Sequence, residues 1–189
     1  MAIETVPAPA ASSPRIVGMR CRACGASHPI GLSYVCPACF GPLEVDYDYQ
    51  VVGATLTREA IASRAPGIWR YAELLPVDEP PSRGLPVGST PLRSADRLAP
   101  ELGLERLWIK DDTRNPSLSF KDRAVAVAAA RAVEFGVEAL ACASTGNLAG
   151  ATAAAAAALG LPAYVFIPAD LEPAKVDHAL AYGATVVPI

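Results

Sequence analysis

A single lysine stands near the start of a predicted helix in the segment NPSLSFKDR, residues 115–123. Ser119 has the character of a helix N-cap, and Asp122 three residues later completes a capping-box pattern. Lys121 therefore falls in the first helical turn, where the helix dipole disfavours an ammonium group by about 0.3 to 1 kcal/mol. A lysine at this position is either tolerated through solvation or placed there because its neutral amine is a nucleophile.

A polar turn follows a short apolar strand in the segment ACASTGNLAGATAA, residues 141–154. The backbone N–H groups at the start of the next helix, together with two hydroxyls and an amide, form a cradle for an anion. The same pattern fits a well-capped helix equally well when it is taken alone. The residues that supply these groups are Ser144, Thr145, Gly146 and Asn147.

Four of the five cysteines form two CxxC pairs separated by eleven residues. Two such pairs place four thiolates tetrahedrally around one zinc ion, and the glycine after each pair allows a tight turn. Disulfides or free thiols are the alternative, and disulfides are disfavoured in a reducing compartment. A closed four-thiolate site is structural, because no position is open for substrate. The predicted zinc ligands are Cys21, Cys24, Cys36 and Cys39.

Strand-like and helix-like segments alternate in the second half of the chain, and a glycine closes each helix. This order predicts an α/β fold with a parallel sheet covered by helices. Six consecutive alanines at residues 153–158 indicate a helix that packs closely on more than one face. The predicted strands are residues 106–110, 139–143, 163–168 and 184–189, and the predicted helices are residues 120–135, 147–159 and 173–182.

Composition divides the 189 residues into four parts. Residues 1–14 are rich in Ala and Pro, lack the features of a secretory signal and are expected to be a disordered leader. Residues 15–46 form the predicted zinc ribbon, and residues 47–90 form a connecting arm punctuated by Pro and Gly. Residues 91–189 hold the α/β region, which stops after a strand. This region is either a finished domain or the first part of a longer one.

The charge pattern excludes several classes of partner. Sixteen basic residues against nineteen acidic ones give a net charge of −3, which argues against nucleic acid held by bulk charge and against a charged membrane anchor. Residues 139–169 carry no charge and are long enough to span a membrane. Ala and Gly dominate this stretch and residues 160–162 (GLP) break it, so two buried strands around a buried helix fit better. A cytoplasmic protein is expected.

Several motifs together resemble the fold-type II pyridoxal-phosphate enzymes, which have the tryptophan synthase β-like architecture. These motifs are GSTPL at residues 88–92, NPSLSFKDR at 115–123 and STGN at 144–147. The two CxxC pairs and IWRYAELLPV at residues 68–77 make the threonine synthase family with an N-terminal zinc ribbon the closest resemblance. It runs from about residue 19 to residue 189. The family usually reads NPTGSFKDR, and Ser117-Leu118 replaces Thr-Gly here.

The resemblance implies the chemistry of the site. Lys121 forms a Schiff base with pyridoxal phosphate, Phe120 packs beside this cofactor, and Asn147 hydrogen-bonds the phenolic oxygen of its ring. The implied reaction converts O-phosphohomoserine and water into threonine and phosphate. The α-carboxylate of this amino-acid substrate is expected on Ser144, Thr145, Gly146 and Asn147.

Members of the resembled family are roughly twice as long as this chain, by two-domain arithmetic. The resemblance therefore implies an N-terminal half, with the cofactor-phosphate loop beyond residue 189 and a homodimer when the protein is full length. Cysteate synthase, serine/threonine dehydratase and cysteine synthase-like enzymes remain open as alternatives. A non-catalytic fragment that uses the zinc ribbon for docking is the alternative from another class.

Overall fold

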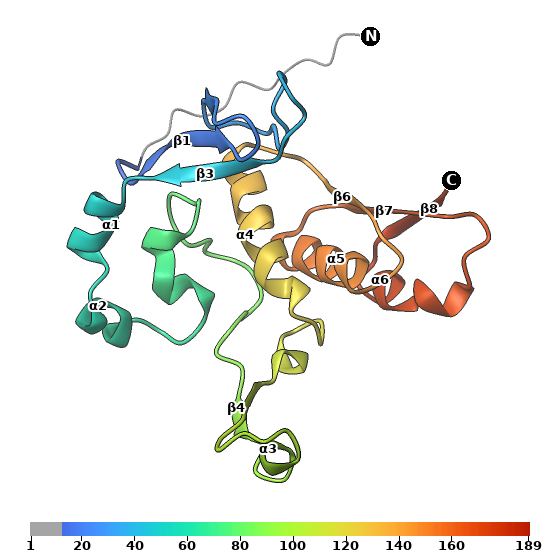
Figure 1. Cartoon of the computed structure of the whole chain (residues 1–189). Coiled ribbons are helices and arrows are strands. Elements are labelled where there is room, and N and C mark those ends of the chain that lie inside the picture. The colour runs from blue at the N-terminus through green and yellow to red at the C-terminus, as the bar shows by residue number, and fades with distance from the viewer. Residues whose placement is uncertain (1–12) are drawn as a thin grey trace. The chain divides into compact units, whose positions relative to one another are not determined.

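The computed structural model describes residues 13–189 (Figure 1). Of the leader predicted at residues 1–14, residues 1–12 lie outside this described part. The described residues form two compact units. The N-terminal unit contains residues 13–65, 69–80 and 130–137, and the C-terminal unit contains Pro66–Ile68, Pro81–Ala129 and Glu138–Ile189.

The N-terminal unit contains a three-stranded antiparallel sheet with the strand order β2-β1-β3. In its register, Met19 of the central strand lies opposite His28 on one side and Val45 on the other. Two short helices follow the sheet, and the side chains of Asp48 and Thr57 cap their first turns. The elements are β1 (Ile16–Cys21), β2 (Ser27–His28), β3 (Leu43–Tyr47), α1 (Tyr49–Thr55), α2 (Arg58–Ser63) and the 3-10 segment η1 (Ile68–Leu74).

The C-terminal unit contains a three-stranded parallel sheet with the order β6-β7-β8, as the alternating pattern predicts. Helices α5 and α6 pack side by side on one face of this sheet (Figure 1). Buried side chains from these helices and from the middle strand form one apolar core. The elements are β6 (Leu140–Ala143), α5 (Asn147–Leu159), β7 (Ala163–Ile167), α6 (Asp177–Ala181) and β8 (Thr185–Pro188).

The alanine-rich helix α5 is buried on two sides, which confirms the prediction of close packing on more than one face. Ala149, Ala153 and Ala156 belong to the core shared with β7 and α6. Ala151 and Ala155 belong to a second core, shared with helix α4 (Lys121–Glu134). Methyl side chains allow these close approaches, because larger side chains would separate the backbones.

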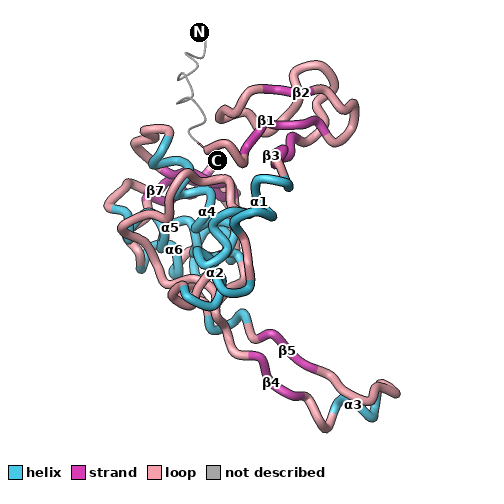
Figure 2. Tube along the Cα trace, turned by 90° about the vertical axis from the view of Figure 1, so that its left-hand side faces the viewer, coloured by secondary structure: helices cyan, strands magenta, loops and turns pink. Residues whose placement is uncertain are grey.

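The strand predicted at residues 106–110 is not part of the parallel sheet. Its core, β5 (Trp108–Lys110), pairs in antiparallel fashion with β4 (Leu92–Ser94), and α3 (Leu98–Glu101) lies in their connection (Figure 2). A connection with only one short helical turn returns the chain beside β4, whereas a parallel neighbour needs a longer crossover.

The helix predicted at residues 173–182 is shorter and interrupted. A 3-10 turn, η3 (Pro173–Lys175), precedes α6, and the break falls at Val176. Asp177 follows directly, and a carboxylate in the first turn favours a helix start at that point. Within residues 13–189, no helix combines the length and the apolar character that crossing a membrane requires.

Candidate functional site

The four predicted zinc ligands lie together in the N-terminal unit, with all their sulfur atoms within 4.8 Å of one another. The Sγ atoms of Cys21 and Cys39 are 3.4 Å apart, and those of Cys24 and Cys36 are 3.8 Å apart. Zinc–sulfur bonds of about 2.3 Å require sulfur atoms about 3.8 Å apart at the corners of a tetrahedron. The cluster therefore has the dimensions of a four-thiolate zinc site.

The two cysteine turns have the same backbone geometry. The amides of Gly25 and Phe40 donate to the carbonyls of Cys21 and Cys36 across corresponding turns. Gly25 has φ +76° and Phe40 has φ +57°, so the left-handed residue of the second turn is a phenylalanine. The prediction that a glycine after each pair forms the turn is thus correct for the first pair and wrong for the second.

Gly41 is needed for a different reason. A Cβ atom at this position would lie 2.8 Å from the sulfur of Cys21 and 3.2 Å from that of Cys39, so only glycine leaves room for both sulfur atoms. The amide of Cys24 donates to Cys21 Sγ at 3.5 Å and lowers the pKa of that thiol to about 6. A lowered thiol pKa favours the thiolate, which is the metal-binding form.

Lys121 is the first residue of α4, at the start of the predicted helix. The Oγ atom of Ser119 accepts a hydrogen bond from the backbone N–H of Lys121 at 3.1 Å, so the serine contributes to the helix start as expected. The predicted part of Asp122 in the capping box, a contact with Ser119, is wrong. The Asp122 carboxylate accepts from the backbone N–H and the hydroxyl of Ser117, at 2.8 and 2.6 Å, because the chain turns back on itself between these residues.

This tight turn places Leu118 at φ +61°, in the left-handed region that favours glycine. The family pattern NPTGSFKDR has its glycine at this position. Leu118 thus occupies a backbone conformation that suits glycine, and its side chain is 69% exposed.

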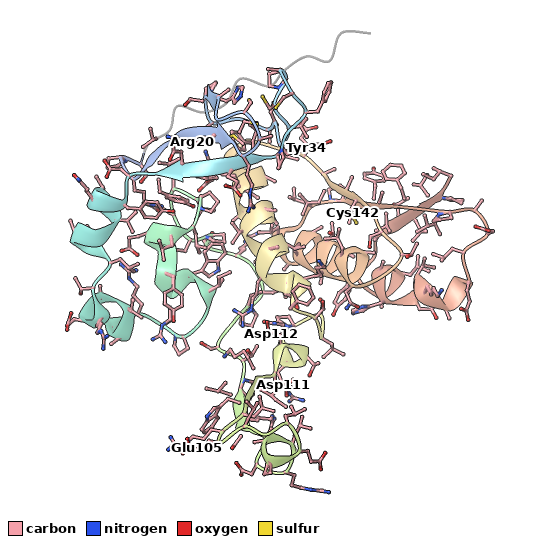
Figure 3. The ribbon with its side chains drawn as sticks, viewed as in Figure 1. Arg20, Tyr34, Glu105, Asp111, Asp112 and Cys142 are labelled. Atoms are coloured by element: carbon pink, nitrogen blue, oxygen red, sulfur yellow. The ribbon has the colours of Figure 1, made fainter. Side chains whose placement is uncertain are left out.

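A polar network connects the GSTPL motif to the segment that carries Lys121. Asp112, which follows β5 (Figure 3), accepts two hydrogen bonds from the guanidinium of Arg123 and one from the hydroxyl of Thr90, at 2.7 to 2.8 Å. The hydrogen bonds from Arg123 lower the pKa of Asp112 to about 2. Arg123 is therefore committed to an ion pair within the chain.

Asn115 extends this network and is almost completely buried. Its side-chain oxygen accepts the backbone N–H of Gly88 at 3.1 Å, and its amide donates to the Asp112 carbonyl at 3.1 Å. Lys110 Nζ donates to the carbonyl of Thr90. Local sequence patterns predict no role for Thr90, Asp112 or Asn115, although Thr90 and Asn115 lie inside the GSTPL and NPSLSFKDR motifs.

The polar turn at residues 144–147 joins β6 to α5. Among residues 13–189, no side chain caps α5, because the Ser144 hydroxyl accepts the backbone N–H of Gly146 at 3.3 Å within the turn itself. The well-capped helix that the pattern also fitted is therefore not the arrangement found. Thr145 and Asn147 are exposed.

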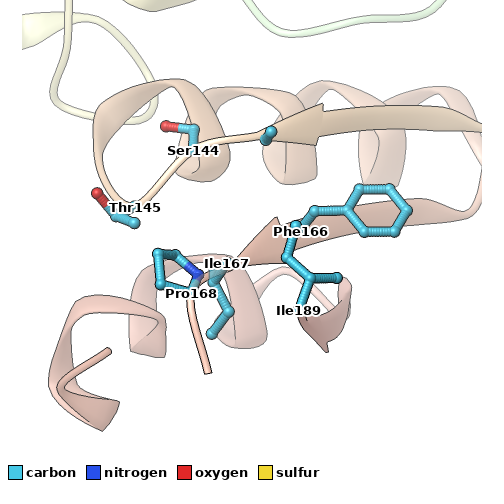
Figure 4. A pocket seen from close by; sticks show the side chains of 7 residues that line it. Ser144, Thr145, Phe166, Ile167, Pro168 and Ile189 are labelled. Carbon is cyan, nitrogen blue, oxygen red and sulfur yellow. The ribbon is translucent and has the colours of Figure 1, made fainter. Parts of the chain in front are cut away.

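An open cavity of about 620 Å³ lies beside this turn, at the carboxyl ends of the parallel strands (Figure 4). Ligands of open α/β sheets commonly bind at this edge. The cavity is lined by Ala143, Ser144, Thr145, Phe166, Ile167, Pro168 and Ile189.

The helices that carry the two predicted parts of the site are neighbours. Val125 of α4 belongs to a core against which Leu148 of α5 packs, and both line an apolar cavity of about 240 Å³. Lys121 lies one helical turn before Val125 and Asn147 directly precedes Leu148, so the two helix starts lie on adjacent elements. Phe120 is 57% exposed, with Lys121 Nζ 4.6 Å from the centre of its ring.

Comparison with known proteins identifies the class. The family described as pyridoxal-phosphate dependent enzyme matches residues 84–189, which are more than half of the chain. The chain therefore belongs to the family of pyridoxal-phosphate dependent enzymes. This match and the parallel sheet with its flanking helices confirm the predicted fold-type II class.

Threonine synthases are among the relatives in sequence. Those of Methanosarcina acetivorans and Methanocaldococcus jannaschii are each 39% identical to the chain over 173 residues, which are 90% of the chain and 42% of each relative. The threonine synthase of Bacillus sp. is 42% identical over 122 residues, which are 64% of the chain and 34% of the relative. The chain thus spans less than half the length of these curated relatives.

Two solved structures are similar to about half of the chain. The processed form of threonine deaminase isoform 2 from Solanum lycopersicum has a TM-score of 0.49 and 28% identity, over 53% of the chain and 28% of its own. O-ureido-L-serine synthase has a TM-score of 0.49 and 26% identity, over 53% of the chain and 32% of its own.

Proposed function

We propose that the chain supplies the cofactor lysine and the substrate-carboxylate cradle of a threonine synthase. This enzyme converts O-phosphohomoserine and water into threonine and phosphate. The observation that carries the proposal is the 39% identity to two threonine synthases over 90% of the chain. An alignment of that extent spans the part of the chain that holds the cysteine cluster, Lys121 and residues 144–147.

The residues present fit a bound pyridoxal phosphate. Lys121 presents its amine at the start of α4, beside the exposed ring of Phe120. The adjacent start of α5 offers backbone N–H groups and the exposed side chain of Asn147 for a polar partner. These are the groups that would hold the cofactor, with Asn147 on its phenolic oxygen.

Pyridoxal phosphate, when bound, supplies an electron sink for charge that develops on the substrate carbons. In this proposal, Lys121 Nζ binds the cofactor and then holds and moves protons at the substrate carbon atoms as a general acid and base. Ser144, Thr145 and Gly146 orient the α-carboxylate through their backbone N–H groups and hydroxyls. Together these contacts fix the position of the substrate relative to the lysine amine.

A structural zinc ion is proposed for the cysteine cluster. The support comes from the sulfur–sulfur distances and from the space that Gly41 leaves beside the sulfurs. Homodimer formation and a cytoplasmic location stay predictions.

The test is a pyridoxal-phosphate titration followed by borohydride reduction and peptide mass mapping. Label fixed on Lys121, and absent from that peptide in Lys121→Ala, is the expected result. In a full-length protein that contains this chain, phosphate release from O-phosphohomoserine without ammonia release from threonine is expected. Ammonia release alone would favour a serine/threonine dehydratase and contradict the proposal.

A further inference from the structure

Asp122, the residue after Lys121, holds the start of α4 to the preceding turn. Its carboxylate is 2% exposed and accepts the backbone N–H and the hydroxyl of Ser117, which is also 2% exposed. Hydrogen bonds to a buried carboxylate are charge-assisted and face little competition from water. The first turn of α4 is therefore held to the loop that leads into it.

Arg123, the residue after Asp122, holds the start of α4 to another part of the C-terminal unit. Its guanidinium donates to both oxygens of Asp112 at 2.8 Å, and Nη2 donates to the hydroxyl of Thr90 at 3.2 Å. A two-pronged pair of this kind fixes direction as well as distance. The helix start is thus bound on one side to Ser117 and on the other to the GSTPL turn.

The side-chain amine of Lys121, the residue before these two anchors, is not held in the same way. Within the described part of the chain, Lys121 Nζ has neither a hydrogen bond nor an ion pair, and its closest aromatic contact is the ring of Phe120 at 4.6 Å. The backbone N–H of Lys121 is bonded to Ser119 Oγ. Hydrogen bonds thus hold the backbone of Lys121, while its Nζ atom remains available to react.

We propose that Asp122 and Arg123 are positioning residues, which fix the backbone of Lys121 so that its amine meets the cofactor in one orientation. The inference rests on the proposed role of Lys121 as the cofactor lysine. A reactive group held in place by bonded neighbours needs less ordering when it reacts. Neither positioning residue needs to touch the cofactor or the substrate.

The experiment uses the fact that the chain has three lysines, Lys110, Lys121 and Lys175. The 189-residue chain is incubated with pyridoxal phosphate, reduced with borohydride and mapped by peptide mass, and label at Lys121 is divided by label at exposed Lys175. Asp122→Asn and Arg123→Gln are expected to lower this ratio about tenfold. Glu59→Gln is the matched control, because it removes an exposed first-turn carboxylate from α2 and leaves the ratio unchanged.

Ser117→Ala separates positioning from charge. It removes the hydroxyl bonded to Asp122 without changing any charge near Lys121, and it is expected to lower the ratio about threefold. It also keeps the test decisive if Asp122→Asn does not fold. All ratios are measured on protein whose circular dichroism matches that of the wild type, because a purely structural role would lower the melting temperature and leave the ratio in folded protein unchanged.

Two results would overturn different statements. A ratio within about twofold of wild type in Arg123→Gln, Ser117→Ala and folded Asp122→Asn would overturn the positioning role and leave the proposed function intact. A wild-type chain that carries no more label at Lys121 than at Lys175 would overturn the proposed cofactor lysine, and the positioning role with it.

Discussion

Replacing Leu118 by glycine should relieve backbone strain directly before the helix that carries Lys121. Leu118 has φ +61° and a side chain that is 69% exposed. The informative comparison is between Leu118→Gly and Leu118→Ala. Both variants lose the side chain beyond Cβ, and only the alanine variant keeps the Cβ atom that the left-handed conformation disfavours.

The expected difference follows from two opposing terms. A Cβ atom in the left-handed region costs about 1 to 2 kcal/mol. Glycine lowers the free energy of unfolding by about 0.4 to 1 kcal/mol relative to alanine, because it gives the unfolded chain more conformational freedom. Leu118→Gly should therefore be more stable than Leu118→Ala by about 1 kcal/mol, which is about 2 to 4 °C in melting temperature for a chain of this size.

The assay is thermal and urea unfolding followed by circular dichroism. Ala124 is exposed within α4 and gives the control, since Ala124→Gly should destabilise the helix by about 1 kcal/mol. The same exchange of alanine for glycine thus has opposite signs at the two positions. Leu118→Ala equal to or more stable than Leu118→Gly would refute the argument from backbone strain.

Three further predictions concern other contacts. Gly41→Ala should lower zinc retention in a chelator competition at least about tenfold, because its Cβ would lie 2.8 Å from a cysteine sulfur, and unchanged retention would contradict the site. The pKa of Asp112 is lowered from 3.8 to about 2, so its ion pair should contribute stability above about pH 4 that is lost as the pH falls through about 2. Acid unfolding curves of wild type and Asp112→Asn should therefore converge at low pH. Gly150→Ala should destabilise the chain by about 1 to 3 kcal/mol through collision with the His178 ring, and adding His178→Ala should recover most of the loss in urea unfolding.

The sequence predicts the elements of the parallel sheet well because the signals there are local. Helix α5 has the predicted bounds, and Gly160 closes it at φ +73°. Helix α4 ends one residue before Phe135, and Gly136 follows at φ +69°. Glycines in the left-handed conformation end helices for reasons that depend only on neighbouring residues.

The pairing of β5 was beyond the reach of local patterns. The segment at residues 106–110 (RLWIK) has three apolar residues between two basic ones, which predicts a strand and does not show which strand lies beside it. The partner, β4, begins sixteen residues earlier and has three exposed residues, so its own pattern is weak.

The polar network at the candidate site was missed for a similar reason. Thr90 and Asp112 are twenty-two residues apart, and Gly88 and Asn115 are twenty-seven apart. The motifs identified these regions, but the capping-box rule assigned Asp122 to the nearest serine in the pattern, while the fold assigned it to Ser117. Contacts between side chains distant in sequence are set by the tertiary structure, which local rules do not describe.

The alanine composition of α5 has a consequence for how precisely its first turn is held. Alanine has no side-chain torsion, so burying Ala151, Ala153 and Ala156 removes no rotameric entropy. For the same reason, its neighbours meet a surface that cannot adapt by changing rotamer. A change in volume on either side is therefore transmitted as a displacement of the whole helix, and the turn at residues 144–147 moves with it. Helix α5 thus behaves as a rigid spacer that sets the position of the proposed carboxylate cradle.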